Sequence, residues 1–204
     1  MTAGRFDWCR PLFILAGGLV LAGGPRHPGG TMVEMLGDPE WIPAHTMMLG
    51  GFLSLLLGLV AFSRGALTPA MRRWAGLAIA GAALQAVEMA LHTAAALDHA
   101  NPMAGRPTPI LSTHLALAIA AYPMFAAAVI GFMVVVLRER ALGSPWIAWI
   151  GVLGALGHGI AAPLTVLAAV PWARSLFPAV VGLAIWLILA GLWPRRPPVA
   201  VAPG

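Results

Sequence analysis

Four residues, three histidines and a glutamate, have the types and the spacing of a metal site. Glu88 and His92 are four positions apart, so on a helix the carboxylate lies one turn from the imidazole. His45 and His114 each lie near the start of an apolar segment. Imidazoles bind zinc, copper and iron, and pairs of imidazoles also bind haem iron. We therefore predict that His45, His92, His114 and Glu88 are metal ligands.

The positions of these histidines relative to arginines predict that they share one depth. His45 lies 19 positions before Arg64, and His92 lies 19 positions after Arg73. If the two segments are antiparallel helices, both imidazoles lie about 28 Å from the arginine layer, at 1.5 Å per residue. His114 starts its segment near the same level. We expect the three imidazoles to converge.

Three further histidines are less informative. His158 lies deeper in its segment and is a candidate for binding a cofactor, because the glycines around it would let a flat macrocycle approach. The same glycines are more commonly used for close helix packing. His27 and His99 fall in loops rich in proline and glycine, where we expect solvated side chains, although His27 could join a metal-collecting loop.

The composition predicts that membrane-spanning helices hold these residues. The chain is 60% hydrophobic and only 9% charged, whereas a soluble domain has about 25% charged residues. Six apolar segments stand out, and all but the first are long enough to cross about 30 Å of hydrocarbon. They lie at about 11–24, 41–62, 75–97, 110–137, 146–170 and 176–193.

We predict an all-α, multipass membrane protein with about six transmembrane helices. Two related hairpins would form a four-helix core, with the first and last helices as flanks. The first segment is short and glycine-rich and follows arginines, so it is either a retained helix, which we favour, or a cleaved signal peptide. Residues 1–194 would form one domain, and residues 195–204 a disordered, proline-rich tail.

The distribution of arginine predicts the orientation. All twelve basic residues are arginines, and nine of them fall in one alternating set of loops and termini. The positive-inside rule places that set in the cytoplasm. Both termini are then cytoplasmic, and the histidine-bearing ends face outward. The arginine bias, with abundant alanine, glycine and proline, is typical of a GC-rich bacterial genome, which favours the bacterial inner membrane. The nine are Arg5, Arg10, Arg64, Arg72, Arg73, Arg138, Arg140, Arg195 and Arg196.

Tryptophans and the single cysteine add little chemistry. Five tryptophans fall at ends of the segments, where an aromatic belt at the membrane interface would place them: Trp41, Trp74, Trp146, Trp172 and Trp193. Cys9 is the only cysteine, which excludes a disulfide within the chain and a thiolate metal cluster. Basic residues are not interleaved with aromatics, so a nucleic-acid partner is not indicated.

These residues favour a redox protein that binds haem b or a transition metal (copper, zinc or iron) near the outer face. Its partners, besides the lipid bilayer, would be a quinone or an extracytoplasmic redox protein. Three alternatives stay open. One is handling of copper or another metal, helped by methionines in the outer half. The second is a metal-assisted hydrolase with Glu88 as general base. The third is a ligand-free structural or assembly subunit among other membrane subunits.

Overall fold

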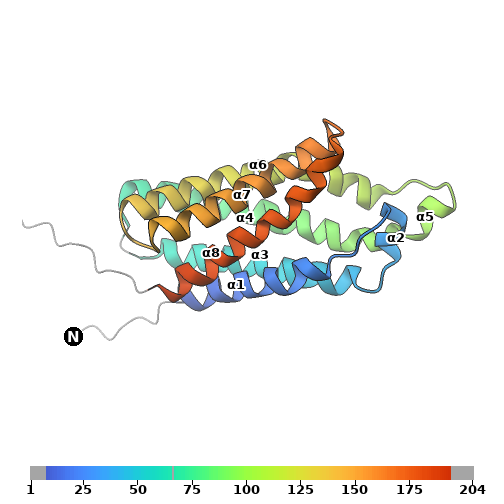
Figure 1. Cartoon of the computed structure of the whole chain (residues 1–204). Helices are drawn as coiled ribbons and strands as arrows, with labels where there is room; N and C mark the ends of the chain where they lie inside the picture. The colour runs from blue at the N-terminus through green and yellow to red at the C-terminus, as the bar shows by residue number, and fades with distance from the viewer. Residues whose placement is uncertain (1–7, 66, 194–204) are drawn as a thin grey trace, which may run out of the picture.

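The computed structural model describes residues 8–65 and 67–193, which form helices joined by turns and short loops, without a strand in these ranges (Figure 1). The all-α prediction is confirmed. The predicted disordered tail, 195–204, lies outside the described residues. The long helices are α1 (Cys9–Gly23), α3 (Trp41–Ser63), α4 (Pro69–Ala94), α6 (Pro109–Arg138), α7 (Pro145–Val166) and α8 (Val180–Leu192). Shorter elements are η1 (Gly24–Arg26), α2 (Met32–Gly37), η2 (Ala95–Asp98), α5 (Ala100–Met103) and η3 (Pro171–Ala179).

Five helical stretches in the described residues are long and apolar enough to cross a membrane. They are Trp41–Ser63, Pro69–Met103, Pro109–Arg138, Pro145–Val166 and Pro171–Leu192. The last begins in η3 and continues through α8. Helix α1 has 15 residues, which correspond to about 22 Å. It is shorter than the hydrocarbon layer of about 30 Å.

The six long helices form a closed ring, in which each packs against two neighbours. The order around the ring is α1, α3, α4, α6, α7, α8 and back to α1. The expected four-helix core with two flanking helices is therefore revised. The α3–α4 and α6–α7 hairpins do lie side by side through α4 and α6, but α1 and α8 together fill the gap between α3 and α7.

Small residues make the closure between helices possible. A Cβ atom at Gly17 of α1 would collide with the backbone oxygen of Ala184 in α8. Likewise, a Cβ atom at Gly154 of α7 would collide with the backbone of Leu183. Lipid offers no hydrophobic driving force between helices, so such close backbone approach supplies the dispersion contacts that hold the ring together.

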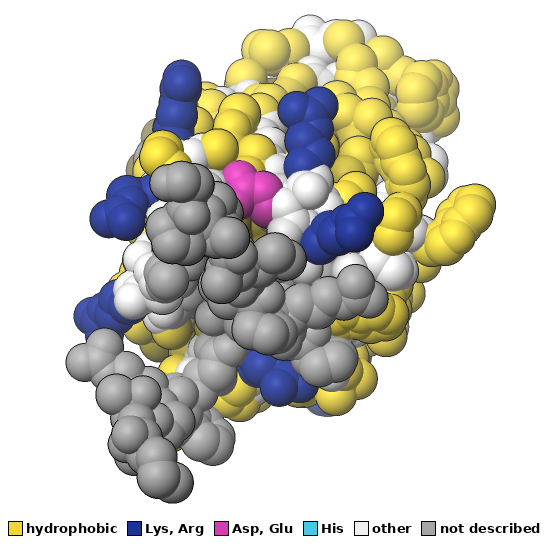
Figure 2. All heavy atoms as spheres, turned by 90° about the vertical axis from the view of Figure 1, so that its left-hand side faces the viewer, with side chains coloured by type: hydrophobic (Ala, Val, Ile, Leu, Met, Phe, Trp, Pro, Cys, Tyr) yellow, Lys and Arg dark blue, Asp and Glu magenta, His cyan; other side chains and the backbone are white. Residues whose placement is uncertain are grey.

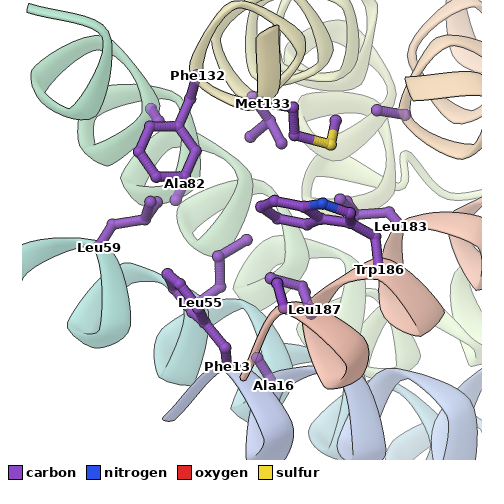
Figure 3. Close-up of a cluster of buried hydrophobic side chains, with 14 of the residues drawn as sticks. Phe13, Ala16, Leu55, Leu59, Ala82, Phe132, Met133, Leu183, Trp186 and Leu187 are labelled. Atoms are coloured by element: carbon purple, nitrogen blue, oxygen red, sulfur yellow. The ribbon is translucent and has the colours of Figure 1, made fainter. Parts of the chain in front are cut away.

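Apolar side chains fill the middle of the ring. Figure 3 shows Phe13 from α1, Phe132 from α6 and Trp186 from α8 pointing toward one another between the helices. All three are at most 1% exposed. Phe132 lies edge-on to Trp186, with ring centroids 6.4 Å apart, a favourable arrangement for two aromatic rings.

The two ends of the ring differ in composition. One end carries the α3–α4 and α6–α7 loops and both ends of the described chain (Figure 1). Arginine side chains gather on this face (Figure 2), and we call it the arginine end. The opposite end carries η1, α2, α5 and η3, and we call it the histidine end. At the arginine end, Arg10 donates hydrogen bonds to the backbone oxygens of Gly191 (2.8 Å) and Leu192 (3.1 Å), which caps α8.

Candidate metal centre

Four imidazoles lie side by side at the histidine end, each from a different element. His27 follows η1, His45 is in the first turns of α3, His92 is near the end of α4, and His114 is near the start of α6. The ring centroids are 4.8 Å apart for His27–His45, 4.2 Å for His45–His92 and 4.0 Å for His92–His114. The structure thus brings together the three histidines that the sequence places at one depth, and it adds His27. We call these four rings the histidine stack.

Glu88 closes the inner end of the histidine stack. Its side chain is fully buried, and one oxygen, Oε2, accepts a hydrogen bond of 2.8 Å from the amide of Gln85. The other oxygen, Oε1, lies 2.7 Å from Nδ1 of His114. The two atoms are close enough for an ion pair, but no hydrogen bond joins them. Two ligands of one metal ion also lie close together without sharing a proton.

Several ligand atoms of this cluster are buried and lack a hydrogen-bond partner. In the described part of the chain these include Glu88 Oε1, His92 Nδ1 and His114 Nδ1. The ligand atoms of Glu88, His92 and His114 lie within 4.8 Å of one another. An unsatisfied buried polar group costs about 1–3 kcal/mol. A bound cation would remove that cost for all three residues together.

The other half of the stack is a second such group. The ligand atoms of His27, His45 and His92 also lie within 4.8 Å of one another. Nδ1 of His45 is 2.6 Å from the backbone oxygen of Trp41, and Nδ1 of His27 is 2.8 Å from that of Pro28. These contacts use Nδ1 as the donor nitrogen, and Nε2 of each ring then carries the free lone pair.

Trp41 positions two members of the stack. Its indole Nε1 donates a hydrogen bond of 3.2 Å to the backbone oxygen of His92, and its ring lies 4.2 Å from that of His45. Trp41 is only 1% exposed, so the prediction that it belongs to an aromatic belt is wrong. The ring is held among the histidines instead of at the lipid surface. Trp146 and Trp172 are 80% and 63% exposed, as the belt requires.

Asp98 sets the start of α6 and therefore the position of His114. The Asp98 carboxylate is buried, and its Oδ2 accepts from the backbone N–H groups of Ile110 (2.8 Å) and Leu111 (2.9 Å). These groups lie in the first turn of α6, where the helix itself provides no acceptor. A carboxylate at a helix N-terminus also interacts favourably with the helix dipole. The sequence did not single out Asp98, because the bond joins residues 12 positions apart.

The loop carrying His27 is held against α3. Arg26 forms a two-pronged ion pair with Glu40, with nitrogen–oxygen distances of 2.8 and 3.2 Å. His27 is exposed on its outer side, yet its ring contacts those of His45 and Trp41. Desolvation accordingly lowers the pKa of His27 below its usual value, which favours the neutral form that binds metals. His27 is exposed, as expected of a loop histidine, but its ring also lies beside those of His45 and His92, because the loop folds over the helix ends.

A capping box starts the short helix α2 beyond this loop. Thr31 accepts a hydrogen bond from the backbone N–H of Glu34, and the Glu34 carboxylate accepts from the backbone and hydroxyl of Thr31 at 2.7 Å each. These bonds hold the pKa of Glu34 below its usual value. The short helix α2 and the ion pair between Arg26 and Glu40 together order the segment between α1 and α3, which carries His27.

His158 and His99 lie outside the stack. The His158 ring packs on Tyr122, with centroids 4.5 Å apart, and its Nδ1 is 3.4 Å from the backbone oxygen of Phe177. Another helix occupies the space beside the neighbouring glycine, since a Cβ atom at Gly159 would collide with the side chain of Ala126. Helix packing therefore explains the glycines, and a cofactor role for His158 stays a prediction. The His99 ring lies against Gly37 of α2.

Three methionines of the outer half have different surroundings. Met48 and Met89 are buried in the apolar core, whereas Met103 is 77% exposed. A copper site with thioether ligands stays a prediction. Nitrogen and carboxylate groups form the candidate centre.

Comparisons of this chain with protein families, with curated proteins and with solved structures find no match. The function has to be inferred from the geometry of the histidine end.

Proposed function

We propose that this chain is a multipass membrane metalloprotein that binds a transition-metal ion through Glu88, His92 and His114. One observation carries the proposal. Buried ligand atoms from two helices, α4 and α6, converge within 4.8 Å, and each of the three residues presents an atom without a hydrogen-bond partner. A chain that inserts into lipid gains nothing from such atoms unless something binds them.

The donor set fits a transition metal. Two imidazoles and a carboxylate bind zinc with one position left open, and they also form the three-ligand face of non-haem iron sites. Ligand atoms at about 2.0–2.1 Å from zinc lie about 3.4 Å from each other in a tetrahedral site. The observed limit of 4.8 Å therefore requires side-chain movements on the order of 1 Å, well within rotamer adjustment.

The surrounding membrane arrangement follows from charge. Applied to the arginine end, the positive-inside rule places that end in the cytoplasm and the metal centre toward the outer face. With α1 counted as a sixth, short span, both termini are cytoplasmic and the chain lies in a bacterial inner membrane. Packing of α1 between α3 and α8 supports its role as a retained helix of the bundle.

Electron transfer is the use of the metal that we propose, with copper or iron as the redox ion. A quinone or an extracytoplasmic protein would be the partner at the histidine end. A single metal ion is better supported than haem. Axial imidazoles on opposite faces of haem have ring centroids about 6 Å apart, given metal–nitrogen bonds of about 2 Å. Consecutive rings of the stack are only 4.0–4.8 Å apart, closer than an axial pair. His27 and His92 are 6.0 Å apart, but the ring of His45 lies within 4.8 Å of both.

A hydrolytic role for Glu88 has less support than a ligand role. A general base needs a free oxygen beside a water molecule. Oε2 of Glu88 accepts a hydrogen bond from Gln85, and Oε1, which has no hydrogen-bond partner, lies in the proposed ligand group beside His114, so neither oxygen would stay free once a metal is bound.

The test is the metal content of the full-length protein purified in detergent. We expect at least one equivalent of copper, iron or zinc in the wild type, and one equivalent less in Glu88→Gln and in His114→Ala. His99→Ala is the matched control, because His99 lies at the same end but outside the stack. Absorption and electron paramagnetic resonance spectra, recorded before and after reduction, test the redox role. Metal-free protein after growth and reconstitution with each ion would refute the proposal.

A further inference from the structure

We propose that the histidine stack holds two metal ions and that His92 is shared between them. The second ion would bind His27, His45 and His92, on the outer side of the ion bound by Glu88, His92 and His114. This inference rests on the proposed function and deepens it, because it concerns the same site.

The outer group meets the same geometric requirement as the inner one. Ligand atoms of His27, His45 and His92 lie within 4.8 Å of one another. His45 is fully buried, and its Nε2 has no hydrogen-bond partner within the described residues. A fully buried imidazole nitrogen without a partner, beside two other imidazoles, is a candidate ligand atom for a metal ion.

The orientation of the outer histidines is that of metal ligands. Both His27 and His45 direct Nδ1 to a backbone oxygen, at 2.8 Å and 2.6 Å. Histidines that bind metals usually donate their other ring N–H to a carbonyl or carboxylate, which fixes the tautomer and the ring direction. In this tautomer Nε2 of each ring is the ligand atom.

His92 belongs to both groups and occupies the middle of the stack. Its ring centroid is 4.2 Å from that of His45 and 4.0 Å from that of His114. An imidazole has two nitrogens, so it binds one ion at each when it is deprotonated. The proton that leaves the ring on binding of the second ion is released to water, as expected when a metal displaces a ligand proton.

The two positions differ in chemistry and access. The inner position includes a carboxylate and is buried, whereas the outer position has three imidazoles and one exposed member, His27. Imidazole-rich sites suit copper and zinc. Exposure of His27 makes the outer ion the more readily exchanged of the two, and the ion pair between Arg26 and Glu40 keeps the His27 loop over it.

The experiment is a titration of metal-free, full-length protein with Zn²⁺ and, separately, with Cu²⁺, followed by equilibrium dialysis and elemental analysis. We expect two equivalents for the wild type and for His99→Ala. His27→Ala should retain one equivalent, Glu88→Gln should retain one, and His92→Ala should lose at least one and weaken the other more than tenfold. Thermal unfolding of each metal-free variant checks that it is folded.

Spectroscopy adds a readout that a merely structural role would not change. Two Cu²⁺ ions joined by one imidazole ring couple magnetically, so the resonance signal per copper should fall below that of isolated ions. It should return to full intensity in His27→Ala, which holds one ion. A wild type that binds one equivalent, unchanged by His27→Ala, would overturn the second position and leave the proposed function intact. Binding of no ion at all would instead refute the proposed function.

Discussion

The two halves of this bundle are built from the same helices but are filled in opposite ways. Toward the arginine end and the middle, the space between helices is occupied by Phe13, Phe132, Trp186 and other apolar side chains. Near the histidine end, the corresponding space holds four imidazoles and a carboxylate. The apolar half satisfies itself, because its dispersion contacts need no partner. The polar half contains buried nitrogen and oxygen atoms that have no hydrogen-bond partner.

This difference separates the half that stabilises the fold from the half that holds the candidate metal centre. In lipid, helices gain little from apolarity alone, so close packing has to hold the ring. The apolar half provides that packing around α1, α6 and α8. Its stability can therefore offset the cost of the buried, unpartnered polar atoms at the histidine end. If the comparison is right, substitutions in the apolar half should lower stability without changing metal binding. Substitutions in the polar half should change metal binding with little effect on stability.

The largest effect is expected in the apolar half. Trp186 is 1% exposed and contacts Phe13 and Phe132, so Trp186→Ala leaves a cavity at the centre of the ring. Loss of a buried tryptophan costs about 3–5 kcal/mol. We expect the free energy of unfolding in detergent to fall by that amount. The amount of metal bound per folded molecule should not change. An equal loss of stability in His114→Ala, without metal, would contradict the comparison.

How much of this arrangement the sequence predicts depends on how local each contact is. Glu88 and His92 are one turn apart, so their shared face is visible in the spacing. The common depth of His45 and His92 follows from counting to the arginines. The ring contacts of His27 and the burial of Trp41 were not predicted, because both depend on how the segment between α1 and α3 folds back. The closed ring was missed for a similar reason, since contacts such as Gly17 against Ala184 join distant segments.

A smaller effect is expected when metal is added to or removed from the histidine end. A ligand that binds only the folded state stabilises it by about 2.7 kcal/mol at one hundred times its dissociation constant. We expect Zn²⁺ to raise the unfolding temperature of the wild type and of Trp186→Ala alike. A chelator should reverse the rise, and His92→Ala, which lacks the histidine common to both proposed positions, should show a smaller rise. An equal rise in His92→Ala would mean that zinc binds elsewhere, and the polar half would then lose its assigned role.

The smallest effect compares one helix cap from each end. Asp98 accepts from two backbone N–H groups of α6 at the histidine end, and Thr68 accepts from the N–H of Met71 in α4 at the arginine end, at 3.2 Å. Replacing either cap by alanine costs about 0.5–2 kcal/mol. Asp98→Ala should also weaken metal binding several-fold, because the first turn of α6 sets the position of His114. Thr68→Ala should destabilise the protein without changing metal affinity, since its helix start lies at the opposite end from the stack. Equal loss of affinity in both variants would mean that metal binding follows overall stability, and the separation between the two halves would fail.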